Sequence, residues 1–170
     1  SDVYKRQGDY YFGFEYQEVC PDIVVLGKPI GNGHPIGVVA TTEEIANNFD
    51  NGIEFFSTFG GSTLSCAIAN EVINVVDQEA LQTNAKKMGA KLKTGLKNLK
   101  DKYQSIGDVR GMGLFVGIEL IDETGRENMR LCRFVKNRMR DFRILIGSEG
   151  PMDNVLKIRP PLSIEIGDIE

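Results

Sequence analysis

The chain has no tryptophan, a single histidine and three cysteines among its 170 residues. The cysteines, Cys20, Cys66 and Cys132, are odd in number, lie far apart and form no C-x-x-C pair. This pattern supports neither a disulfide framework nor a zinc site, so we predict no bound metal. Reduced thiols are typical of intracellular proteins, and we expect a cytoplasmic or mitochondrial location.

The sequence also lacks an excess of positive charge and a long apolar run. Twenty basic residues stand against twenty-four acidic ones, for a net charge of −4. Without a basic stripe, nucleic acid is not an expected partner. No apolar run approaches the length that crosses a membrane. A hydrophobic content of 41% is ordinary for a globular protein of one domain or a modest pair.

The most informative feature present is Lys28, in the segment Gly-Lys-Pro-Ile-Gly-Asn-Gly-His-Pro of residues 27–35. The apolar run at residues 23–26 leads into it and predicts a buried strand. Ligands of open α/β sheets gather at the carboxyl ends of strands. A lysine held there, partly out of water, can act as an amine nucleophile. The alternative is a solvated surface lysine. His34 has no second histidine or acid near it in sequence, so we interpret it as packing or hydrogen bonding beside this turn.

Hydrophobic periodicity predicts the other elements. Thr41 and Glu44 have the spacing of a capping box, and Ser62 is a candidate N-cap. Within the last helix we expect Met129, Cys132, Phe134, Val135 and Met139 to point inward. The expected strands cover 36–40, 106–110, 114–120, 144–146 and 155–158, and the expected helices cover 42–49, 63–77, 80–103 and 126–141.

Several blocks of the sequence resemble the class III pyridoxal-phosphate aminotransferases, in the order and at about the spacing of that family. They are residues 21–35, 56–62 (Phe-Ser-Thr-Phe-Gly-Gly-Ser), 107–114 (Gly-Asp-Val-Arg-Gly-Met-Gly-Leu) and 156–162 (Leu-Lys-Ile-Arg-Pro-Pro-Leu). The resemblance implies an α/β fold of type I, namely the end of the large-domain sheet followed by a small α+β domain.

The resemblance also implies how the chain is divided. Residues 8–85 would be the C-terminal part of the cofactor-binding large domain, and residues 86–170 a truncated small domain. Residues 1–7 do not resemble what the family places before this region, so we predict that they are not native. Family members are far longer, and this chain looks like their second half. The family's cofactor phosphate loop, the aromatic residue that stacks on the cofactor ring and the aspartate that pairs with the ring nitrogen have no counterpart here.

The family match assigns roles to five residues. Lys28 would carry pyridoxal 5'-phosphate as an internal aldimine and move protons during the reaction. Thr58 would reach the cofactor phosphate of a neighbouring subunit, which implies a homodimer with a shared site, and Gly60 and Ser62 at the same helix start would also bind the cofactor. An ordinary helix N-cap is the alternative for this segment. Arg159 would bind a substrate carboxylate, with a structural salt bridge as the alternative.

The resemblance therefore implies a transaminase that passes an amino group from a small amino donor to a 2-oxo acid. The residues from Gly150 to Lys157 look closest to a branch of the family that contains phospho-lyases acting on phosphorylated amines. In that branch the position of Arg159 is often lysine, so the reaction type stays open. A third possibility is that the chain by itself is an inactive fragment.

Overall fold

The computed structural model describes residues 8–170, and within them the chain forms two compact units. Unit 1 comprises residues 10–80, and unit 2 comprises residues 8–9 and 81–170. The prediction that residues 1–7 are not native concerns residues outside the described range. The predicted boundary between residues 85 and 86 stays a prediction for the domains of a longer protein.

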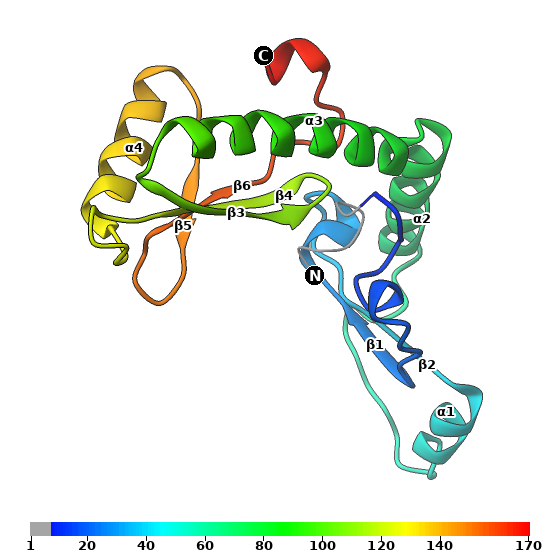
Figure 1. The fold of residues 1–170 in the computed structure, drawn as a ribbon. Coiled ribbons are helices and arrows are strands. Elements are labelled where there is room, and N and C mark those ends of the chain that lie inside the picture. The colour runs from blue at the N-terminus through cyan, green and yellow to red at the C-terminus, as the bar shows by residue number, and fades with distance from the viewer. Residues whose placement is uncertain (1–7) are drawn as a thin grey trace. The chain divides into compact units, whose positions relative to one another are not determined.

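Unit 1 is built on a two-stranded antiparallel ribbon, in which Ile23 pairs with Thr41 and Leu26 with Val38. The predicted first strand is confirmed to the residue, and the second begins two residues later than predicted. The helix expected after Ser62 is also present, one residue longer than predicted. The elements of this unit are η1 (Glu15–Gln17), β1 (Ile23–Leu26), η2 (Lys28–Gly31), β2 (Val38–Thr41), α1 (Glu43–Phe49) and α2 (Thr63–Gln78) (Figure 1).

The prediction that these two strands are buried is wrong for this chain. Val25 is 72% exposed and Val39 is 66% exposed, because a two-stranded ribbon has no second layer among the described residues of unit 1. The cap of α1 also differs by one residue. Thr41 still belongs to β2, where its hydroxyl donates to the carbonyl oxygen of Asp22 at 3.0 Å. Thr42 therefore caps the helix by accepting from the Ile45 N–H at 3.4 Å.

Unit 2 is an antiparallel sheet with the strand order β3-β4-β6-β5 and helices on one face. The core joins the sheet to α3 and α4 through Leu96, Val109, Val116, Ile118, Leu120, Cys132 and Leu156. Figure 1 shows α3 running along the sheet. The elements are α3 (Leu81–Lys102), β3 (Ile106–Met112), β4 (Phe115–Leu120), α4 (Met129–Asp141), β5 (Gly147–Glu149), β6 (Val155–Ile158) and η3 (Ile166–Asp168).

A close approach of backbones joins α3 to the bend between β3 and β4. Gly111 and Gly113 have φ angles of 135° and 50°, which only glycine adopts without strain. Gly89 of α3 lies against this bend, and a Cβ placed on it would overlap the backbone carbonyl of Gly113. A second core cluster of Ala85, Met88 and Leu114 lies beside this contact. The bend at residues 111–113 is therefore a point of close approach between helix and sheet.

Two predictions in unit 2 are wrong. Residues 144–146 form a loop, in which Leu145 is 90% exposed, and the strand begins at Gly147, the first residue in register with β6. In α4, Met129 and Phe134 are exposed. The prediction is confirmed for Cys132 and Val135, which pack against the sheet together with Leu131, and Met139 is partly buried. The helix begins at Met129, after an Asn128 N-cap, rather than at residue 126.

Candidate active site

Lys28 is the first residue of a tight turn that directly follows β1. Its φ angle is 47°, in the left-handed region that L-residues other than asparagine and aspartate seldom enter. Backbone bonds close the turn from Ile30 N to Gly27 O at 3.4 Å and from His34 N to Gly31 O at 3.0 Å. Ile30 is 3% exposed and anchors it. The Lys28 side chain is exposed in this chain. This differs from the expectation that the lysine lies partly out of water.

His34 joins this turn to helix α2. Its Nε2 atom lies 2.8 Å from the Oγ of Ser65, in a partly buried contact between residues that are far apart in sequence. The turn η2 also packs against α2. The interpretation of His34 as a packing or hydrogen-bonding residue is therefore confirmed. Ser65 was not singled out in the sequence, because a serine in the first turn of a helix carries no signal of a distant partner.

The segment from Thr58 to Ser62 forms the entry to α2. The Ser62 hydroxyl accepts from the Ser65 N–H at 3.4 Å, which confirms the predicted N-cap. The Gly60 N–H donates to Ser57 Oγ at 3.0 Å, and Thr58 is exposed. The start of a sixteen-residue helix presents backbone N–H groups without helical partners and a positive dipole end. The arrangement can attract an anion, and it is equally that of an ordinary capped helix.

Arg159 lies in unit 2, directly after β6 and before Pro160 and Pro161. Its side chain is exposed. Lys28 belongs to unit 1, so the structure places these two predicted site residues each within its own unit. By contrast, the lysine turn, His34 and the start of α2 belong to one unit and are joined by direct contacts.

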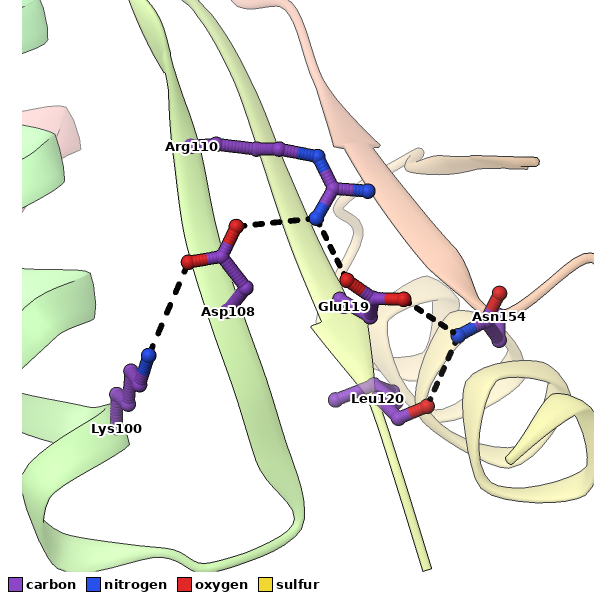
Figure 2. Close-up of polar contacts among 6 residues, drawn as sticks. All are labelled: Lys100, Asp108, Arg110, Glu119, Leu120 and Asn154. Atoms are coloured by element: carbon purple, nitrogen blue, oxygen red, sulfur yellow. Dashed lines mark hydrogen bonds and ion pairs between the residues drawn. The ribbon is translucent and has the colours of Figure 1, made fainter. Parts of the chain in front are cut away.

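A charged network joins strands β3 and β4 of unit 2 to Asn154, with Lys100 of α3 at its edge (Figure 2). Arg110 Nη1 donates to Asp108 Oδ2 at 3.1 Å and to Glu119 Oε2 at 2.7 Å. Asn154, which is 3% exposed, donates to Glu119 Oε1 at 3.4 Å and to the Leu120 carbonyl at 3.2 Å. Lys100 Nζ lies 3.8 Å from Asp108 Oδ1.

This network changes the titration of its members. The hydrogen bond from Arg110 is the main cause that lowers the pKa of Asp108. The pKa of Arg110 is raised, chiefly by Glu119 and then by Asp108. Glu119 and Asn154 could not be found from sequence, because their contacts depend on the strand register, in which Asp108 lies opposite Glu119.

Residues 8–170 lack the features of two other kinds of site. In that range no helix combines the length and the apolar character that crossing a membrane requires. The same residues contain no group of three or more histidine, cysteine, aspartate or glutamate side chains arranged to hold a metal ion.

Known proteins are similar to this chain in both sequence and structure. It is 47% identical over 161 residues to an alanine–glyoxylate aminotransferase 2-like protein of Drosophila melanogaster, a match that covers 92% of this chain and 33% of the fly protein. Its structure is similar to that of a phospholyase from Arthrobacter solved in complex with phosphoethanolamine. That match has a TM-score of 0.93 and 38% identity, and it covers 97% of this chain and 40% of that one.

A third similarity is to an amine transaminase from an uncultivated Pseudomonas species, solved in its PLP-bound form. The TM-score is 0.83 and the identity 29%, with coverage of 96% of this chain and 39% of that one. The chain thus spans about a third of the length of the curated relative and about two fifths of the solved structures. The profile of the family described as "Aminotransferase class-III" matches residues 5–170. With nearly the whole chain matched by one family, and with the fold of that family's solved members, the chain belongs to the class III aminotransferases.

Proposed function

We propose that the protein containing this chain is a pyridoxal-phosphate-dependent aminotransferase in which Lys28 binds the cofactor covalently through Nζ. The observation that carries the proposal is the position of Lys28, an exposed primary amine on a closed turn at the end of β1, in a chain matched by the family over residues 5–170. Bound pyridoxal phosphate supplies an electron sink for the substrate carbon. The amine of Lys28 is then the group that moves a proton to and from that carbon.

The cofactor fits the donors that unit 1 offers. Its aldehyde requires an amine, which Lys28 provides, and its phosphate requires N–H donors, which the start of α2 provides. We propose that Thr58, Gly60 and Ser62 bind the phosphate of a cofactor held by a second copy of the chain, so that a homodimer shares its sites. The segment that contains Thr58 supports this role, because Phe55, Phe56 and Phe59 on it are exposed and suit contact with another chain.

The substrates we propose are a small amino donor and a 2-oxo acid. Arg159 is the residue we assign to the substrate carboxylate, because a planar guanidinium holds a carboxylate by two parallel hydrogen bonds. Pro160 and Pro161, which follow Arg159, limit the backbone freedom of this segment. The compartment, cytoplasm or mitochondrion, stays a prediction from the reduced cysteines.

A second candidate reaction is elimination of phosphate from a phosphorylated amine. The similarity that favours it is the phospholyase match, whose TM-score of 0.93 exceeds the 0.83 of the amine transaminase. The two reactions differ in what they consume and release. A phospho-lyase releases inorganic phosphate without a 2-oxo acid, whereas a transaminase needs the acceptor and releases no phosphate. Assay of both products with phosphoethanolamine, with and without a 2-oxo acid, separates them.

We propose that the isolated 170-residue chain is inactive. It spans about a third of the fly relative, and the resemblance assigns none of its residues to stack on the cofactor ring or to pair with the ring nitrogen. Without a partner for the ring nitrogen, the electron-sink chemistry of the cofactor is weakened.

The test is borohydride trapping of added pyridoxal phosphate followed by peptide mapping, on this chain and on the complete protein encoded by its gene. We expect a reduced adduct on Lys28 in the complete protein and little or none in the isolated chain. Lys28→Arg should abolish the adduct, whereas Lys97→Arg, which changes an exposed lysine of α3, should not. An unmodified Lys28 in the complete protein would overturn the assignment.

A further inference from the structure

The turn that carries Lys28 has backbone conformations that depend on support from neighbouring contacts. Lys28 and Asn32 both have φ angles of 47°, and Gly33 has a φ angle of 104°. A left-handed backbone costs free energy for a residue with a Cβ atom, and more for a lysine than for an asparagine. Such conformations persist where the surrounding structure fixes them. The contacts that fix this turn therefore decide where the Lys28 amine lies.

Two contacts tie the turn to the rest of unit 1. One is the side chain of Ile30, which is 3% exposed. This contact is apolar and non-directional. It therefore keeps the turn packed against unit 1 but does not fix the orientation of the turn. The other is the hydrogen bond between His34 Nε2 and Ser65 Oγ, at 2.8 Å and partly buried. It joins the far end of the turn to the first turn of α2, and it requires a defined distance and direction.

Ser65 makes two different contacts at once. Its backbone N–H donates to the N-cap hydroxyl of Ser62, and its side-chain oxygen meets His34. Ser65 thus bonds to the N-cap residue of α2 and also contacts His34, at the end of the turn that carries Lys28. A shift of the turn and a shift of the helix start are therefore mechanically linked through one side chain.

From these contacts we infer that His34 and Ser65 form a positioning pair that holds the strained Lys28 turn against the start of α2. Neither side chain is assigned to the reaction. They act through Lys28, by keeping its backbone in the left-handed conformation and its amine at a fixed place relative to the helix. This inference rests on the proposed function for its catalytic consequence, whereas the structural tether can be measured on its own.

The tether is tested first, by hydrogen–deuterium exchange of residues 27–35 in the complete protein without cofactor. His34→Leu and Ser65→Ala each remove one partner, and we expect the amides of Ile30 and His34 to exchange about tenfold faster in both variants. His34→Gln keeps a polar nitrogen within reach of Ser65 and should restore most of the protection. Ser148→Ala is the matched control, since it removes a serine hydroxyl bonded to Lys136 in unit 2 and should leave residues 27–35 unchanged.

The consequence for Lys28 is tested by the rate at which borohydride traps pyridoxal phosphate on it. We expect trapping to slow about tenfold in His34→Leu and Ser65→Ala, and no further in the double variant, because both changes break the same bond. His34→Gln should recover most of the rate. Equal trapping rates in all variants, additive losses in the double variant, or unchanged exchange at residues 27–35 would each overturn the inference. If the unaltered protein traps nothing at Lys28, the proposed function fails, and the exchange result still decides whether the tether exists.

Discussion

Units 1 and 2 of this chain place their apolar side chains differently. In unit 2, ten apolar residues are buried, and most of them lie between the sheet and helices α3 and α4. In unit 1, Ile30, Ala69 and Val76 are buried, while Ile53, Phe56 and Phe59 are each at least 79% exposed. A four-stranded sheet covered by two helices encloses a core, and a two-stranded ribbon that no second layer covers does not.

The difference teaches which part of the chain supplies its stability. Burial of apolar surface is the main favourable term in folding, so unit 2 contains most of what holds this chain together. Unit 1 contains the residues with the strongest claim to chemistry and leaves apolar surface open to solvent. Exposed apolar patches of that kind favour self-association, which agrees with the proposal that a second copy contacts the Phe55–Phe59 segment.

The largest expected effect comes from the contact between Gly89 and Gly113. Gly89→Ala would force the new Cβ into the backbone of the bend, so α3 and the sheet must separate. Since backbone cannot yield as a side-chain end can, we expect a loss of about 3 kcal/mol or more in the free energy of unfolding. Urea unfolding of the 170-residue chain measures it.

A matched control lies in the same helix. Gly95 is exposed, and a Cβ placed on it meets no atom within 4 Å. Gly95→Ala should therefore raise stability by about 0.5–1 kcal/mol through helix propensity. If the two alanine variants unfold at the same urea concentration, the close approach of α3 to the bend is not as described, and the account of the unit 2 core fails with it.

A leucine in each unit allows the same substitution to be compared between a buried and an exposed position. Leu114 is fully buried beside Ala85 and Met88, and Leu114→Ala should cost about 2–5 kcal/mol, the usual range for a buried leucine. Leu64 of α2 is 66% exposed, and Leu64→Ala should change stability by less than about 0.5 kcal/mol. Both are measured by the same unfolding experiment. Similar losses in the two variants would show that unit 1 buries Leu64 in solution.

The comparison of units also explains which features were predictable from the sequence. The sequence predicts features correctly where the neighbouring residues decide the outcome, as for the strand at residues 23–26 and the Ser62 cap. The prediction of buried strands is wrong at Val25 and Val39. Burial depends on which layer covers a strand and not on the sequence of the strand itself. The strand expected at 144–146 is a loop because pairing with β6 starts at Gly147.

The candidate site follows the same division. Lys28 was identified from its local setting of strand end, glycines and prolines. The bond from His34 to Ser65 joins residues 31 positions apart. The network around Arg110 depends on a register that pairs Arg110 with Gly117 and Asp108 with Glu119. Neither contact leaves a trace in composition or periodicity, since both arise from the way distant elements pack.

The smallest expected effect concerns that charged network of unit 2. Asp108, Arg110 and Lys100 are each about half exposed, and ion pairs of this kind contribute about 0.2–1 kcal/mol. Asp108→Asn should therefore cost less than about 1 kcal/mol at neutral pH. The loss is far below that of Leu114→Ala, because water competes for both charges.

The pH dependence of that loss identifies its cause. The pKa of Asp108 is lowered from its ordinary value of 3.8, so the folded state binds the proton of this carboxyl more weakly than the unfolded state does. Its contribution to stability is therefore complete above about pH 5 and declines as the pH falls through 3.8 toward the lowered value.

The experiment is unfolding in urea at pH 6 and at pH 3. The difference in stability between Asp108→Asn and the unaltered chain should be present at pH 6 and smaller at pH 3. A cost of Asp108→Asn that is the same at both pH values would mean that the Asp108 carboxylate charge contributes nothing to stability in the network of Figure 2.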